Sequence, residues 1–199
     1  MSDEISIDHE TFGRLAWDED FWYGRVTLPG WAGFRVRLGT EEDLEDDDGT
    51  AILSIEPGMD EPSAPPSEAQ ARAFLHLVRN EAAVTHAVQR AILAEYPKFR
   101  KAYGRIPEAA ARMPRARTIA DLQPLIGLVI VHVVRAERDG MAYVGFELGC
   151  SWDEEHGVGV MTHAGRIVEV GHADIGFSVF EDETAPIAPP ARWWEFWKT

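Results

Sequence analysis

The sequence predicts an α+β domain in which an antiparallel β-meander and a set of N-terminal strands pack against one long helix and a shorter one. Apolar residues recur at helical spacing within residues 67–120, whereas they alternate with other residues within 125–172. Short strand-like runs separated by turn residues fill residues 12–55. These three segments together predict the fold class.

The chain has 199 residues and a mass of 22.2 kDa. A domain of this size buries roughly 70% of the surface of its unfolded chain, so it needs no disulfide or metal to fold. We therefore expect a single domain over residues 1–180, with a proline-rich linker at 56–66. Residues 181–199 are predicted to form a Pro- and Trp-rich tail outside the domain.

The N-terminal strands are predicted at residues 21–28, 34–38 and 51–55, with a turn at Pro29-Gly30. Between the last two of these runs, seven of the eight residues 41–48 are acidic. A run of like charges is typical of a solvated loop, and we predict such a loop there.

The helical part begins with a clear start signal. Ser67 and Gln70 match a capping box, in which each side chain can bond to the backbone N–H of the other residue. Pro97 predicts that the helix ends at about Tyr96. Residues 98–117 carry seven basic side chains and one acidic one, and are predicted to form a short second helix and a basic loop.

The meander consists of four predicted strands, at residues 125–137, 141–152, 157–163 and 166–171. The connections between them are predicted at Asp139-Gly140, at 153–156 and at Ala164-Gly165.

Charge is distributed unevenly along the chain. The sequence has 34 acidic and 19 basic residues, for a net charge of -15. This balance argues against nonspecific binding to nucleic acid or to an anionic membrane. Residues 1–66 hold 17 acids and 4 bases, whereas residues 67–120 hold 4 acids and 10 bases. A basic partner is therefore expected to bind residues 1–66 and the acidic stretch that includes Asp153.

The single cysteine, Cys150, excludes an internal disulfide framework and a cysteine-rich zinc module. The N-terminus shows no apolar signal segment, and the apolar run at 125–134 is too short to cross a bilayer. We therefore expect a cytoplasmic protein that does not contact the membrane.

One candidate site is a pair on neighbouring strands. If Asp139-Gly140 forms a two-residue turn, His132 lies directly opposite Glu147. A histidine oriented by a carboxylate can act as a general base, but it can also be an ordinary cross-strand pair. Gly145 and Gly149 flank Glu147, so either a helix packs closely on this face or the glycines leave room for a ligand.

The second candidate site is the acidic stretch around residue 154. Its residues are Trp152, Asp153, Glu154, Glu155 and His156. The principal interpretation is a solvated turn, and a less favoured one is a metal site built from Asp153, Glu155, His156 and Asp174. The strand register places His156 on the opposite face from His172, unless Gly157 or Gly159 forms a bulge.

Aromatic residues near the C-terminus form a third candidate. Trp193, Trp194 and Trp197 would lie on one side of a short helix. They either bind a partner or dock back onto the domain as satellite core.

Residues 144–160, VGFELGCSWDEEHGVGV, resemble an uncharacterised bacterial domain of unknown function. The signature G-F-E-x-G-C-x-W-D-E-E-H-G-x-G-V carries the resemblance, which extends over roughly residues 17–177. It implies a single bacterial cytoplasmic α+β domain and transfers no activity to any residue.

The sequence contains no P-loop, nucleophile elbow, zinc-protease or Cys-x-x-Cys motif. We therefore expect a noncatalytic protein-interaction domain with no cofactor. Its partner could be a basic toxin, which an immunity protein neutralises by binding it. The alternatives are a metal-dependent hydrolase and a small-molecule sensor, both using residues 153–156.

Overall fold

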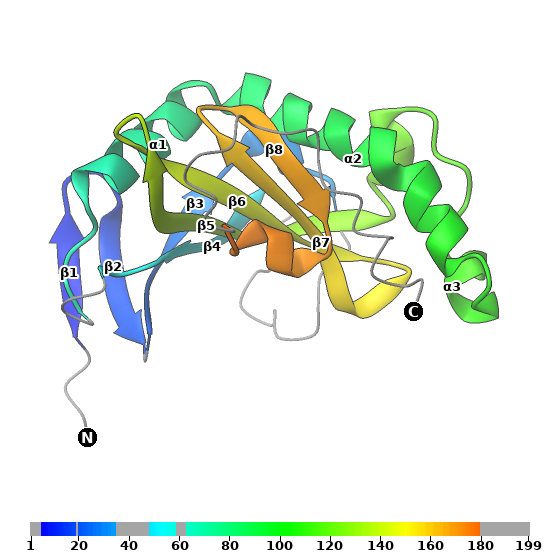
Figure 1. Cartoon of the computed structure of the whole chain (residues 1–199), viewed down its shortest axis with the longest axis horizontal. Helices are drawn as coiled ribbons and strands as arrows, with labels where there is room; N and C mark the ends of the chain where they lie inside the picture. The colour runs from blue at the N-terminus through cyan, green and yellow to red at the C-terminus, as the bar shows by residue number, and fades with distance from the viewer. Residues whose placement is uncertain (1–4, 19, 35–47, 59–62, 180–199) are drawn as a thin grey trace.

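A computed structural model describes residues 5–18, 20–34, 48–58 and 63–179. They form one eight-stranded sheet whose strands follow each other in chain order. The strands are β1 (Ser6–His9), β2 (Gly13–Asp18), β3 (Phe21–Thr27), β4 (Thr50–Ile55), β5 (Ile126–Arg138), β6 (Met141–Cys150), β7 (Asp153–His163) and β8 (Arg166–Gly171). The predicted α+β class is confirmed (Figure 1).

All neighbouring strands of this sheet are antiparallel except β4 and β5, which are parallel. A parallel pair needs a long crossover connection. The helices α1 (Glu68–Arg79), α2 (Glu81–Tyr103) and α3 (Pro107–Ala111) lie within that connection. Among the described residues, no helix is long and apolar enough to span a bilayer.

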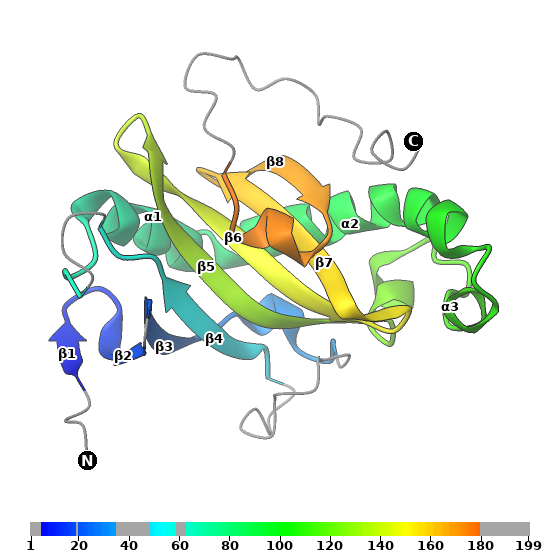
Figure 2. The same ribbon diagram turned by 60° about the horizontal axis from the view of Figure 1, so that its bottom comes forward.

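The two faces of the sheet are covered differently. The helices α1 and α2 run along one face, and the short 3-10 helix η3 (Ala173–Gly176) lies on the other (Figure 2). Alternate residues of β6, namely Val144, Phe146 and Leu148, are buried in the core on the helix side. A much smaller apolar cluster of Val134, Met161 and Ile175 lies under η3. We term this second side the open face.

The helical part differs from its prediction, which had one helix ending at Tyr96. The capping box at Ser67 is confirmed, but α1 ends at Asn80 and a second helix begins there. The amide side chain of Asn80 donates to the backbone carbonyl of His76, and the backbone carbonyl of Asn80 accepts the N–H of Val84. Asn80 therefore ends one helix and starts the next.

The helix α2 also continues through Pro97, so the predicted stop at this residue is wrong. Proline removes one helical hydrogen bond, which normally ends a helix. Here Tyr96 and Phe99 flank the proline, and each is only 1% exposed. Burying two large aromatic side chains outweighs the local cost of the proline.

We therefore expect Pro97→Ala to stabilise the protein by about 1–3 kcal/mol, because alanine restores the missing N–H donor within an intact helix. Chemical denaturation would measure the change. A loss of stability in this variant would show that the proline itself is needed to seat the two aromatic rings.

The N-terminal strands were predicted in part. The runs at 21–28 and 51–55 correspond to β3 and β4, whereas β1 begins at Ser6, before the predicted strand region. Of the predicted strand 34–38, only Phe34 lies within the described residues, where it is buried after the 3-10 helix η1 (Pro29–Trp31). Of the acidic run 41–48, only Asp48 is described.

Candidate functional site

A dense group of polar side chains lies at the start of β7, beside the C-terminal end of α2. The Oδ1 atom of Asp153 accepts hydrogen bonds from the backbone N–H groups of Glu155 (3.2 Å) and His156 (3.0 Å). The imidazole Nδ1 of His156 lies 3.1 Å from the same oxygen. Residues 153–156 therefore begin a strand rather than forming the predicted loop, and the turn lies at Ser151 and Trp152.

Tyr103 closes this group from the side of α2. Its phenol donates a hydrogen bond to Oδ2 of Asp153, and its oxygen lies 3.5 Å from Nδ1 of His172. The ring centroids of His172 and His156 are 5.9 Å apart. Side chains from α2, β7 and the end of β8 thus meet, and we term Tyr103, Asp153, His156 and His172 the Tyr103 cluster.

The meeting of His156 and His172 follows from irregular backbone between them. Gly157 has a φ of +57°, which glycine adopts readily and other residues rarely do. The pairing of β7 with β8 also shifts by one residue between Met161 and Thr162. The regular register, which would place the two imidazoles on opposite faces, does not hold here.

Burial and hydrogen bonding shift several pKa values in the Tyr103 cluster. Burial raises the pKa of Asp153, but the hydrogen bonds from Tyr103 and His156 outweigh it, so the net pKa lies below its usual value. Burial and the bond to Asp153 raise the pKa of Tyr103. Burial lowers the pKa of His172 despite the nearby carboxylates. At neutral pH the cluster therefore contains a charged carboxylate, a neutral phenol and a neutral His172.

The metal site suggested by the sequence has a different arrangement in the structure. Both carboxylate oxygens of Asp153 accept hydrogen bonds from protein groups, while Glu155 and Asp174 are exposed. The side chain of Glu154 lies outside the described part of the structure. Among the side chains that are described, no three from His, Cys, Asp or Glu are arranged to hold a metal ion.

The aromatic residue of the signature belongs to the core. Trp152 is 5% exposed, and its ring centroid lies 5.4 Å from that of Tyr96 and 6.0 Å from that of Phe99. It fixes the β6–β7 turn against α2. Trp193, Trp194 and Trp197 lie outside the described residues.

The Asp153 carboxylate makes a testable contribution to stability. We expect Asp153→Asn to lower the free energy of unfolding by about 1–2 kcal/mol at pH 7, because hydrogen bonds to a charged acceptor are lost. The folded-state pKa of Asp153 is lowered, so its contribution is complete above the unfolded value of about 3.9 and is lost as pH falls through the folded value. Chemical denaturation at pH 7, 5 and 3 should show a constant difference that shrinks only at the lowest pH. A difference that disappears by pH 5 would contradict this assignment.

A second group of polar side chains crosses the open face. Ser54 of β4 is the register partner of Tyr23 on β3 and of His132 on β5. Nε2 of His132 lies 2.9 Å from Oε2 of Glu147 on β6. We term these four residues the polar row. Ser54 is 3% exposed and His132 is 8% exposed, so both are buried beneath the surface of this face.

The contact of His132 with Glu147 arises from a register that differs from the predicted one. The residue directly opposite His132 is Gly145, so Glu147 reaches it diagonally. A register irregularity between Val133 and Glu137 causes the shift. The predicted two-residue turn therefore gives the correct cross-strand partners of β5 and β6 close to the turn, but not further along these strands.

Sequence reasoning missed Tyr23 and Ser54 as members of the polar row. The only available signal was Ser54, which interrupts an otherwise apolar run in residues 51–55. Its neighbours across the sheet depended on the parallel pairing of β4 with β5, which brings together segments more than 70 residues apart.

The glycines on the open face serve close packing of η3. A Cβ atom on Gly145 would lie 1.5 Å from the carbonyl oxygen of Gly176, and one on Gly159 would lie 2.3 Å from that of His172. For Gly145, one of the two glycines that flank Glu147, the close packing of a helix therefore holds. The ring of Phe177, which follows η3, lies 5.4 Å from that of His132.

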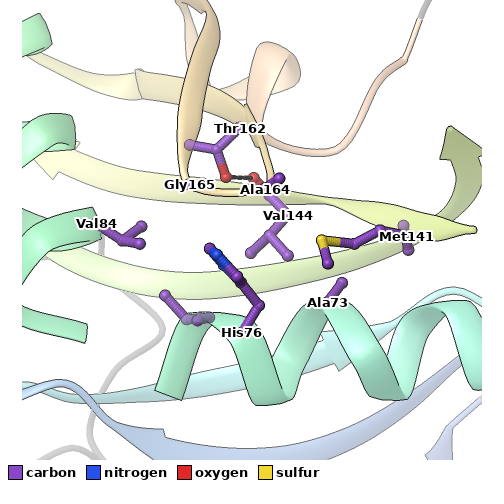
Figure 3. A pocket seen from close by; sticks show the side chains of 10 residues that line it. Ala73, His76, Val84, Met141, Val144, Thr162, Ala164 and Gly165 are labelled. Carbon is purple, nitrogen blue, oxygen red and sulfur yellow. Dashed lines mark hydrogen bonds between the residues drawn. The ribbon is translucent and has the colours of Figure 1, made fainter. Parts of the chain in front are cut away.

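A hollow lies on the helix side, away from both groups of polar residues. It is lined by α1, by the start of α2 and by the β7–β8 turn, and the ring of His76 projects toward it (Figure 3). Its empty volume of about 230 Å³ includes space open to solvent. The enclosed part of the hollow is only about 10 Å³, room for about one water molecule, whereas pockets for small molecules usually enclose about 300–1,000 Å³. The hollow therefore gives the sensor alternative little support.

A family model described as "Domain of unknown function (DUF6985)" matches residues 12–177. The chain belongs to this family. The expected resemblance to an uncharacterised domain family is thereby confirmed, and the DUF6985 region includes the polar row and the Tyr103 cluster. No curated protein and no solved structure matches the chain.

Proposed function

We propose that this DUF6985 protein is a noncatalytic interaction domain whose open face binds a positively charged segment of a protein partner. An immunity-type role, in which a bacterial cytoplasmic protein covers a basic toxin, belongs to this proposal. The observation that carries it is the convergence of carboxylates around Tyr23.

Three carboxylates act electrostatically on the phenol of Tyr23. Burial raises the pKa of Tyr23, and the negative charges of Asp18, Asp20 and Glu147 raise it further. Asp18 and Asp20 are exposed at the β2–β3 turn, and neither belongs to an ion pair within the described residues. Phe21 adds an aromatic ring 6.2 Å from that of Tyr23. Carboxylates beside aromatic rings favour a lysine or arginine side chain.

A second pair of carboxylates extends the negative charge across the open face. Glu169 on β8 is opposite Met161 of the cluster under η3, and burial followed by the charge of Asp174 raises its pKa. Arg25 is a cationic side chain on β3 of the same face. Arg14 of β2 also lies on this face, because it is two residues before Ala16, the register partner of Tyr23. The five carboxylates named here still outnumber these two arginines.

A concentration of basic residues lies at another end of the molecule. Lys101 and Arg105 are exposed at the end of α2, before α3, which lies at the opposite end of the molecule from β1 and β2 (Figure 1). A partner with a basic segment is thus attracted to one part of the domain and repelled from another. Such a charge arrangement orients an incoming partner and raises its association rate.

The experiment compares partner capture by matched variants of the full chain. The open-face variant carries Asp18→Asn and Asp20→Asn, and the control carries Glu108→Gln and Glu137→Gln, which change the net charge equally. We expect a partner retained from host lysate by the native chain to bind the control normally and the open-face variant at least tenfold more weakly, a loss of about 1.4 kcal/mol.

A third variant tests the acidic run at residues 41–48, the other concentration of negative charge. In this variant each Asp and Glu of the run is replaced by the corresponding amide. Partner binding that is lost with this variant and retained by the open-face variant would overturn the assignment to the open face. Equal binding by all variants would overturn the charge-based proposal itself.

A further inference from the structure

We propose that the end of α2, together with α3 and the loop that follows it, forms a second interaction surface that binds an acidic segment of a protein partner. We term residues 98–117 the basic end. This proposal is independent of the one for the open face, because the partner has the opposite charge. The surface also lies at the opposite end of the molecule from β1 and β2 (Figure 1).

The basic end carries a local excess of positive charge in a chain whose net charge is -15. It contains seven basic side chains and one acidic one, Glu108. Of the acids just outside it, Glu95 is paired with Lys98. Asp121 accepts the backbone N–H of Arg117. The acids near this surface therefore leave most of its positive charge uncompensated.

Four cations of the basic end are accessible to a partner. All four are exposed, and none of them belongs to an ion pair within the described residues. They are Lys101, Arg105, Arg115 and Arg117. The apolar side chain of Ile106 lies among them in the chain and is 49% exposed. The basic end thus combines unpaired cations with an apolar contact point.

Hydrogen bonds fix the loop after α3 against α2. The phenol of Tyr96 donates to the backbone carbonyl of Pro114 at 2.8 Å. Nε of Arg100 donates to the backbone carbonyl of Met113 at 2.9 Å, and the Met113 side chain is buried. The loop is therefore ordered before a partner arrives, which reduces the conformational entropy lost on binding.

The surroundings favour a protein segment over nucleic acid as the acidic partner. Proteins that bind single-stranded nucleic acid stack the bases on accessible aromatic rings. In the basic end, Phe99 is buried and the phenol of Tyr103 bonds to Asp153. A protein segment can place an apolar side chain on Ile106 beside its carboxylates. The acidic remainder of the chain also repels a polyanion that extends beyond the basic end.

Fluorescence anisotropy of the full chain with two labelled peptides tests this surface. One peptide has six glutamates around a central leucine, and the other has serine in place of the leucine. We expect saturable binding of the leucine peptide that weakens at least fivefold between 50 and 300 mM NaCl, because salt screens exposed charges. Lys101→Gln combined with Arg105→Gln should weaken this binding at least tenfold.

The matched control combines Arg79→Gln with Arg90→Gln, which removes the same charge from exposed positions of α1 and α2 outside the basic end. It should leave the affinity within twofold of the native value. The native chain should bind the leucine peptide at least threefold more tightly than the serine peptide, and Ile106→Ser should abolish this preference. Circular dichroism checks that each variant folds.

An oligo(dT) with six phosphates carries the same charge as the peptides and tests nucleic acid as the partner. Tighter binding of oligo(dT) than of the leucine peptide would overturn the assignment to a protein segment. Absence of peptide binding by the native chain would overturn the surface itself. So would an equal loss of affinity in the control and in the variant of Lys101 and Arg105.

Discussion

Replacing Gly145 by alanine is expected to destabilise the protein by about 3 kcal/mol, at the upper end of the usual cost of overpacking. The added Cβ would lie 1.5 Å from the carbonyl oxygen of Gly176 and 2.5 Å from its carbonyl carbon. Backbone atoms of η3 cannot turn aside as a flexible side chain can. The helix must therefore move away from the sheet, which exposes the apolar cluster of Val134, Met161 and Ile175.

Chemical denaturation measures this effect, and Gly58→Ala is the matched control because a Cβ atom there meets nothing within 4 Å. The control should change the free energy of unfolding by less than about 0.5 kcal/mol. Equal stability of the two variants would mean that η3 does not pack on Gly145 as described.

Replacing Trp152 by alanine is expected to cost about 3–5 kcal/mol, the usual range for removing a large buried aromatic side chain. Its ring packs between the β6–β7 turn and the part of α2 that holds Tyr96 and Phe99. The substitution leaves a cavity at the point where the end of α2 is fixed to the sheet. Because Asp153 is the next residue, loss of this packing should also loosen the Tyr103 cluster.

The matched control for this prediction is Phe177→Ala, since Phe177 is aromatic but 46% exposed. We expect it to cost less than about 1 kcal/mol. Trp152→Phe should fall between the two alanine variants, because it keeps part of the ring volume. A Trp152→Ala cost similar to that of the Phe177 control would show that the tryptophan is not core.

Local patterns predicted much of the fold. The capping box at Ser67 and the turns at Asp139-Gly140 and Ala164-Gly165 are present, and alternation correctly assigned the buried face of β6. The continuation of α2 through Pro97 was not predictable in this way, because it depends on the burial of neighbouring aromatic residues against distant strands. Tertiary packing there outweighs a local stop signal.

The candidate sites were predictable only in part, for a related reason. A pair of polar residues close together in the sequence, such as Asp153 and His156, can be identified from the sequence alone, and these two side chains do interact. Tyr103 joins them from α2, about 50 residues before, and His172 joins from about 20 residues after, where the pairing of β7 with β8 shifts by one residue between Met161 and Thr162. Register rules count residues along regular strands, so a single bulge reverses the faces that they assign.

The proposed role of the open face is tested most directly by mapping the bound partner. The ¹⁵N-labelled chain is titrated with the partner that it retains, and backbone and side-chain resonances are followed by NMR. We expect the largest shifts at Asp18, Asp20, Tyr23 and Glu147, with little change at Lys101 and Arg105. If the resonances of β2 to β6 on the open face stay unchanged and the shifts concentrate on α2 and α3, the proposed binding role of the open face is wrong.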